Sequence, residues 1–138
     1  MKRIAMIAVA VSMMSGCMMF MKAPSDPAAY EPTQVSEAQA YRASFAPVEA
    51  IKVGKLHQWT IAVQSADGTP VDDARITVDG GMPQHGHGLP TKPVVTQSLG
   101  EGRHLVEGMK FNMGGWWVVK LQIDGAGGKD VVTFNLKL

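Results

Sequence analysis

Apolar and polar residues alternate along most of the chain after position 49, and this period of two restricts the fold strongly. In the clearest segment, 116–123, one face carries Lys120 and Gln122, and the other carries only large apolar residues: Trp117, Val119, Leu121 and Ile123. Successive side chains of a β-strand point to opposite faces, so such a segment is typical of a strand with one buried face. No stretch after Pro47 shows a helical repeat. We therefore predict an all-β fold.

Similar runs occupy 56–63, 75–79, 94–99, 103–107 and 132–138, with turn residues between them. Gly100-Glu101-Gly102 predicts a tight hairpin, because glycine accepts positive φ freely. Six or seven strands at intervals of about 8 to 12 residues predict an immunoglobulin-like β-sandwich, with a small closed barrel as the alternative. The predicted core consists of Trp59, Ile61, Ile76, Trp117, Val119, Leu121 and Phe134.

The N-terminus has the pattern of an export signal. Two basic residues, Lys2 and Arg3, precede an uncharged and mostly apolar run, 4–14. That run is shorter than the roughly 20 residues that a transmembrane helix needs and has the length of a signal-peptide core. Met14-Ser15-Gly16-Cys17 then resembles the bacterial lipobox. We predict that residues 1–16 are a lipoprotein signal peptide and that Cys17 carries the lipid; an ordinary secretory peptide is the alternative.

Residues 17–47 are predicted to be the lipid anchor and a flexible tether. Four prolines punctuate this segment, at positions 24, 27, 32 and 47, and Ala, Ser and Gln are frequent. Proline-rich linkers are extended and semi-rigid. The remaining residues, 48–138, are predicted to form one sandwich domain.

The charge balance of the mature chain argues against nucleic-acid binding, and the predicted anchor indicates a location in the cell envelope. Cleavage removes Lys2 and Arg3, which leaves 11 basic and 12 acidic residues. Because no basic stripe is available to neutralise phosphates, nucleic-acid binding is not expected. We expect a membrane-tethered protein of the cell envelope. Met18 is not the acidic residue typical of inner-membrane retention, so the periplasmic face of the outer membrane is favoured if the host is Gram-negative.

Histidine and methionine gather in one part of the predicted domain. All three of its methionines and three of its four histidines lie between positions 82 and 113. Imidazole suits copper and zinc, whereas thioether sulfur selects Cu(I). The composition of this region therefore indicates copper, with Cu(I) favoured. Two motifs contain the candidate ligands: Met-Pro-x-His-Gly-His-Gly at 82–88 and Gly-x-x-Phe-x-Met-x-Gly-x-Trp at 108–117.

At these two motifs, over roughly residues 50–136, the sequence resembles the YtkA-like family of small exported immunoglobulin-like domains related to the FixH group. The resemblance implies an association with copper and with cytochrome oxidase maturation. It carries over Met82, His85, His87 and Met113 as motif positions. These four residues are the predicted metal ligands.

Other residues have secondary roles, and a metal-free interpretation of the segment stays open. Met109 is a less favoured ligand, and His57, on the inward face beside Trp59, is a candidate ligand or supporting residue. His104 is predicted to face solvent, and Trp116 to mark a partner surface. The alternative is an ordered Ω-loop whose histidines bond to backbone carbonyls and whose methionines fill one end of the sandwich.

No nucleophile paired with a base stands out, so no enzymatic activity is expected. Two functions from different classes remain. The first is a copper-binding or copper-delivering envelope lipoprotein, whose partner is a copper-dependent or envelope assembly protein. The second is a metal-free interaction or assembly module of the cell envelope.

Overall fold

The computed structural model describes residues 21–138. The predicted signal peptide, 1–16, and the predicted lipidation site, Cys17, lie outside the described residues. Within 21–138, no helix is long and apolar enough to span a membrane. The secondary structure of this part of the chain consists of nine strands and one short 3-10 helix, η1 (Pro27–Tyr30).

Five strands form one antiparallel sheet, in the order β1-β2-β3-β7-β6. Its members are β1 (Thr33–Val35), β2 (Tyr41–Pro47), β3 (Leu56–Ser65), β6 (Val94–Gly100) and β7 (Arg103–Lys110). The predicted hairpin at 100–102 joins β6 to β7, and all three of its residues have positive φ.

The other four strands form a second antiparallel sheet, in the order β5-β4-β8-β9. Its members are β4 (Arg75–Met82), β5 (His87–Gly88), β8 (Trp116–Gly125) and β9 (Gly128–Lys137). The short strand β5 pairs only with Gly81 and Met82, at the end of β4.

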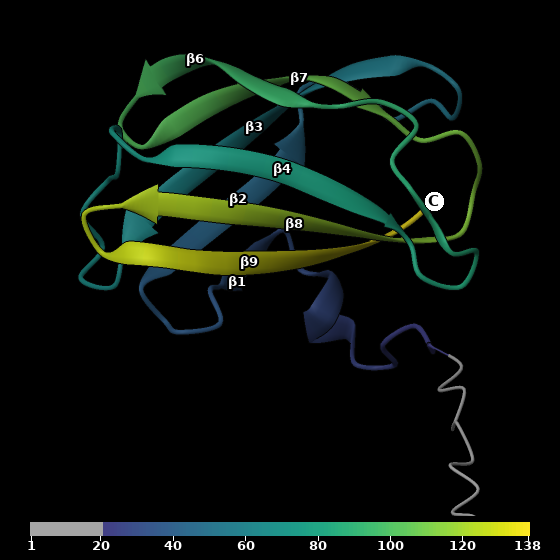
Figure 1. The fold of residues 1–138 in the computed structure, drawn as a ribbon, viewed down its shortest axis with the longest axis horizontal. Helices are drawn as coiled ribbons and strands as arrows, with labels where there is room; N and C mark the ends of the chain where they lie inside the picture. Colours follow the sequence, from purple (N-terminus) through teal and green to yellow (C-terminus); the bar gives the residue numbers. More distant parts are fainter. Residues whose placement is uncertain (1–20) are drawn as a thin grey trace, which may run out of the picture.

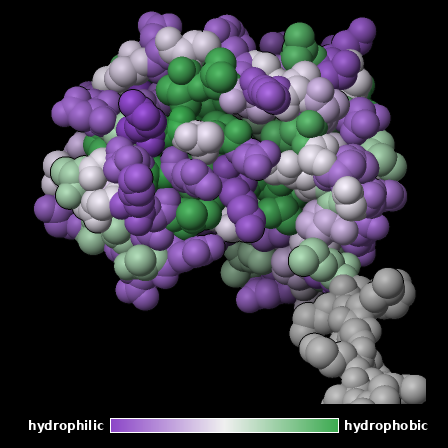
Figure 2. All heavy atoms as spheres, viewed as in Figure 1, coloured by the Kyte–Doolittle hydropathy of each residue, from purple (hydrophilic) through white to green (hydrophobic). Residues whose placement is uncertain are grey.

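The two sheets pack face to face, with β4, β8 and β9 in front of β2 and β3 in the view of Figure 1. All seven predicted core residues are buried between the sheets. The prediction of an all-β sandwich is therefore confirmed. Outside the core, polar residues cover much of the visible face, with apolar areas between them (Figure 2).

The order of the strands corresponds to a known arrangement. An immunoglobulin constant-type sandwich places strands ABED opposite CFG. In this chain β2-β3-β7-β6 lies opposite β4-β8-β9 in the same order. The predicted number of strands, six or seven, is too low, because β1 and β2 come from the predicted tether and β5 from the histidine segment.

The predicted flexible tether is wrong over β1 and β2. Three residues of β2, Tyr41, Ala43 and Phe45, belong to the core. The Phe45 ring stacks on Trp59 of β3 with a centroid distance of 4.3 Å. The prolines are compatible with this order, because Pro27 begins η1 and Pro47 is the last residue of β2, where the missing N–H is tolerated. The domain therefore begins well before residue 48.

Asp130 of β9 holds the turn between β1 and β2 against the second sheet. Its carboxylate, 7% exposed, accepts hydrogen bonds from the backbone N–H groups of Ala38 and Ala40 at 3.0 and 3.2 Å. Burial raises the pKa of the Asp130 carboxyl, but hydrogen bonds from the Ser36 hydroxyl and from three backbone N–H groups outweigh burial and lower the pKa to about 2. A partner 90 residues away in the sequence thus orders this turn.

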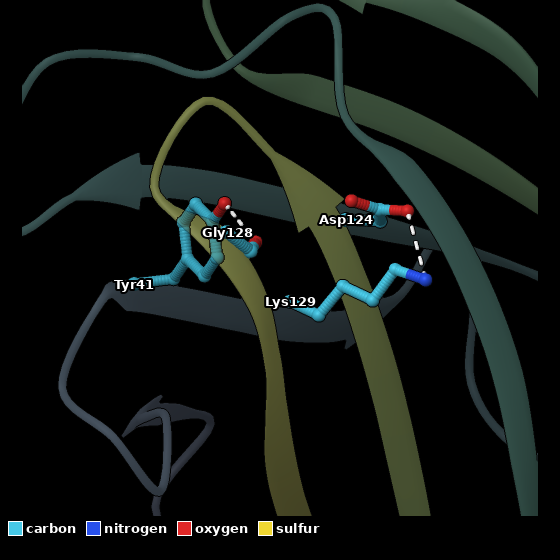
Figure 3. A network of polar contacts seen from close by, with 4 residues as sticks. All are labelled: Tyr41, Asp124, Gly128 and Lys129. Atoms are coloured by element: carbon cyan, nitrogen blue, oxygen red, sulfur yellow. Dashed lines mark hydrogen bonds and ion pairs between the residues drawn. The ribbon is translucent and has the colours of Figure 1, made fainter.

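Tyr41 makes a second link between the sheets at the same end (Figure 3). Its hydroxyl donates to the Gly128 carbonyl oxygen at 2.6 Å, at the start of β9. Next to this contact, Lys129 and Asp124 form an ion pair at 3.8 Å, with both side chains largely exposed. Exposed ion pairs contribute little to stability, so the part-buried hydrogen bond of Tyr41 is the more important contact of the two.

Candidate metal centre

The Met82–Gly88 motif forms a tight hairpin between β4 and β5. The Met82 carbonyl accepts hydrogen bonds from the N–H groups of His85 and Gly86, both at 3.0 Å. Gly86 has a φ of 66°, which glycine adopts without strain. The chain then reverses, so that His87 lies directly opposite Met82 in the β4–β5 ladder.

This register places a thioether and an imidazole side by side, because directly opposite residues of two strands project from the same face. Met82 is buried and His87 half-buried. The Nδ1 atom of His87 lies 3.0 Å from the Gly88 carbonyl oxygen. This contact suits a Nδ1–H donor, and it leaves the Nε2 lone pair free.

His85 lies in the turn itself and is exposed. Its ring centroid is 5.9 Å from that of His87, with an angle of 38° between the planes. The structure thus brings the two histidines of the motif together.

Trp117 connects this hairpin to the loop between β7 and β8. Its ring meets the His87 ring edge to face, with the centroids 5.6 Å apart. Its indole Nε1–H donates to the Met113 carbonyl at 3.0 Å. One fully buried side chain therefore fixes both predicted ligand segments at the same end of the sandwich, near the C-terminus in Figure 1.

Gly115 lets the two segments approach closely. A Cβ atom at this position would lie 2.8 Å from the Met82 Cε atom, so the tip of Met82 rests against the Gly115 backbone. Met113, two residues earlier, is half-buried and packs against the core.

The two secondary candidates, Met109 and His57, lie opposite each other in the other sheet, on β7 and β3. Met109 is fully buried. The His57 Nε2 atom accepts a hydrogen bond from the Lys52 N–H at 2.8 Å, so the neutral ring carries its proton on Nδ1. His57 therefore has no free lone pair in this arrangement.

The prediction that His104 faces solvent is wrong. Its side chain is 2% exposed, and its Nε2 atom lies 3.0 Å from the Val71 carbonyl oxygen. His104 shares the inward face of β7 with Val106. The sequence already indicates this inward orientation, because residues two positions apart on a strand point to the same face.

The neighbouring tryptophans have different environments, as predicted. Trp117 is fully buried, whereas Trp116 is half-buried and donates from Nε1 to the Asn135 Oδ1 atom at 2.9 Å. Part of the Trp116 side chain remains accessible to a partner.

An open hollow of about 660 Å³ lies beside the hairpin, on the outer face of β4 and β8. Met82 and His87 contribute to its lining, together with the charged residues Asp79 and Lys120. Sequence reasoning did not identify these two charged residues, because nothing local to them indicates a site.

The donors in this region are of mixed type. Within residues 21–138 there is no group of three or more His, Cys, Asp or Glu side chains that could hold a metal ion. The arrangement instead combines two imidazoles with methionine sulfur, a set suited to a soft ion.

The fold and these residues define a class: a small antiparallel β-sandwich with histidine and methionine on two loops at one end. The sequence model of the family described as YtkA-like matches residues 35–122. The chain belongs to the YtkA-like family. The match includes both motifs and also β2, which confirms the predicted family.

The other comparisons give little more. No curated protein matches the chain. Among solved structures, a ZirS C-terminal domain is similar with a TM-score of 0.40 and 10% sequence identity, over 99% of this chain and 95% of that one.

Proposed function

We propose that this protein binds Cu(I) in the cell envelope and hands it to a copper-dependent or envelope assembly protein. The observation that carries the proposal is the opposition of Met82 and His87 across the β4–β5 ladder, with His85 beside them. The proposed role is binding and transfer of the ion, without catalysis.

The distance between the two histidine rings fits a shared ion. Two imidazoles bound to one ion, each with a metal–nitrogen bond of about 2 Å, have ring centroids about 5 to 6.5 Å apart. The observed separation is 5.9 Å. The contact of His87 Nδ1 with a backbone carbonyl is the supporting interaction usual for a metal-bound histidine.

Thioether sulfur makes Cu(I) the preferred ion over zinc, which favours thiolate, imidazole and carboxylate. Met82 is the first sulfur ligand proposed, because it shares a face with His87. Met113 is the second, since Trp117 ties its backbone to the same end of the sandwich. Met109 is the less favoured substitute, and His57 is left out of the ligand set.

The position of the proposed ligands at the surface supports transfer of the copper ion rather than its storage. His85 is exposed and His87 is half-buried, so part of the proposed ligand set is accessible from solvent. An anchor at Cys17 would keep the domain close to a membrane-bound acceptor.

The test is a Cu(I) competition titration of the full chain against a chromophoric chelator. We expect His85→Ala, His87→Gln, Met82→Leu and Met113→Leu each to weaken binding about tenfold or more. Leucine replaces methionine in both cases because this exchange preserves volume and the fold. Met21→Leu is the matched control, since Met21 is exposed and distant from both motifs in the sequence.

One result of this titration would contradict the proposal. A folded wild-type protein that binds no Cu(I) at micromolar concentration would refute the proposal. The metal-free interaction module, presenting the hairpin and Trp116 to an envelope protein, would then be the better hypothesis.

A further inference from the structure

One edge of β4 is open along most of its length. β8 pairs along one side of this strand (Figure 1), whereas β5 covers the other side only at Gly81 and Met82. On that other side, the Leu89 N–H donates to the Gly80 carbonyl at 3.0 Å. Within the described part of the chain, residues 75–79 have no neighbouring strand there. We call these five residues the β4 edge.

The backbone of the β4 edge presents hydrogen-bonding groups without a strand to pair with. In a strand, the N–H and C=O groups of every second residue point to the same side. The Gly80 carbonyl points away from β8, so the backbone groups of Ile76 and Val78 also point to the open side. Such a row of groups is a template for another strand. The β4 edge can therefore accept a fifth strand in this sheet.

Two exposed charged residues, Arg75 and Asp79, form the two ends of the β4 edge. In the ladder with β8, Arg75 lies opposite Asp124. Asp79 lies opposite Lys120. Neither pair is an ion pair, and Arg75 and Asp79 form none elsewhere among residues 21–138. The Asp79 carboxylate instead accepts a hydrogen bond at 2.7 Å from the Gly80 N–H, which points to the open side. Both charges are thus available to a partner at this edge.

We infer that the β4 edge binds the β4 edge of a second copy of this chain, in antiparallel orientation. A two-fold axis at Thr77 pairs all five residues of both edges. Ile76 then lies opposite Val78 of the second copy, and the open backbone groups of the two residues face each other. Arg75 lies opposite Asp79 of the second copy, and by symmetry this contact occurs twice. The two four-stranded sheets become one continuous sheet.

The order of the charges selects a second copy over another strand. Charged residues usually protect an edge from pairing. Here each Arg75 meets an Asp79, and opposite charges directly across two strands stabilise the pairing. Side chains keep their faces only when the register shifts by two residues, and such a shift in either direction removes both Arg–Asp contacts. The residues of the β4 edge therefore specify both the partner and the register.

This dimer keeps the two candidate metal centres apart. Met82 lies five positions after Thr77, so the two Met82 residues lie about 34 Å apart along the paired strands. No metal ligand is shared between the copies. The inference therefore does not rest on copper binding, and a failure of Cu(I) binding would leave it standing.

Sedimentation equilibrium of the full-length Cys17→Ser protein in detergent tests the association. We expect a reversible dimer with a micromolar dissociation constant, because five paired residues make a small interface. Arg75→Asp in this background should weaken the dimer at least tenfold, since it places two pairs of like charges opposite each other. Asp79→Arg should do the same. Arg42→Asp is the matched control and should leave the dimer unchanged, since Arg42 is exposed on β2 in the other sheet.

An equimolar mixture of the two weakened variants is the most specific measurement. Every contact between an Arg75→Asp chain and an Asp79→Arg chain joins opposite charges, so a mixed dimer should form with an affinity within about threefold of the parent. The inference is overturned if the parent stays monomeric at high micromolar concentration. It is also overturned if either variant dimerises as tightly as the parent, or if the mixture does not associate.

Crosslinking checks the register of the two strands. Thr77→Cys in the Cys17→Ser chain supplies a single thiol, whose Cβ atom lies about 5 Å from its copy across the two-fold axis. A short bismaleimide should therefore join the two chains. Gln122→Cys is the control, because Gln122 lies opposite Thr77 on β8 and its two copies are about 14 Å apart, or three strand spacings. Failure of Thr77→Cys to crosslink, or equal crosslinking of both variants, overturns the inferred pairing.

Discussion

Trp117 is the single residue on which both predicted ligand segments depend. Its ring contacts His87, and its indole N–H holds the Met113 carbonyl. Its ring also meets Phe111 edge to face, at 5.2 Å between centroids. Loss of this side chain therefore affects both the core and the site.

We predict that Trp117→Ala lowers the free energy of unfolding by about 3 to 5 kcal/mol, as large aromatic truncations in cores do. Trp116→Ala should cost about 1 to 2 kcal/mol, for one hydrogen bond and partial burial. Urea denaturation monitored by circular dichroism measures both. Equal costs would contradict the difference in burial between the two tryptophans.

Asp130 makes stability depend on pH. Its folded-state pKa, about 2, is below the ordinary value of 3.8. A lowered pKa means that the ionised carboxylate stabilises the fold fully above about pH 4. This contribution is lost as the pH falls toward 2.

Asp130→Asn should lower the free energy of unfolding by about 1.5 to 3 kcal/mol at pH 7, because hydrogen bonds to a charged acceptor are replaced by weaker ones. The difference from wild type should shrink between pH 4 and pH 2 in urea denaturation series. Asp124→Asn is the control, since Asp124 is half-exposed and its ion pair with Lys129 contributes little. A difference that persists unchanged at pH 2 would refute this role.

At the scale of elements, strands after residue 49 are predictable because alternation is a local property. β3, β8 and β9 bury the faces that the sequence predicts. β2 also alternates, with Tyr41, Ala43 and Phe45 inward. The nearby prolines and small residues concealed this pattern, and the contacts with Asp130 that order the preceding turn come from the far end of the chain.

Part of the candidate metal centre was also predictable, because the residue types of the two loops are a local property of the sequence. Clustering of histidine and methionine identified the two loops. The pairing of Met82 with His87, by contrast, follows from the turn at Gly86, whose outcome the sequence does not dictate. The Nε2 contact of His57 with a backbone N–H is likewise invisible without coordinates.

Removal of β1 and β2 tests the corrected domain boundary. A chain starting at residue 48 lacks the Phe45–Trp59 stack and leaves one edge of β3 unpaired. We predict that it is unfolded or aggregates, whereas a chain of residues 21–138 unfolds cooperatively. Thermal melts and limited proteolysis measure this difference. A stable fragment that begins near residue 48 would restore the tether hypothesis.

At the scale of the whole molecule, the lipid anchor predicted at Cys17 would determine where the domain works. Cys17→Ser should move the protein from the membrane fraction to the soluble fraction, because two or more acyl chains are needed for stable attachment. Fractionation followed by immunoblotting measures the distribution. Unchanged membrane retention would refute the anchor, and Ser25→Thr, which leaves the whole lipobox in place, controls for expression.

The pairing of Met82 with His87 has a consequence for how such a sequence can change over time. Side chains alternate faces along a strand, so a one-residue insertion or deletion between these positions would turn His87 to the opposite side. Substitutions at Pro83 or Gln84 leave the spacing intact. The hairpin is therefore free to vary in composition while its length is held constant, and related chains that keep this pairing should differ in the segment by substitution far more often than by insertion.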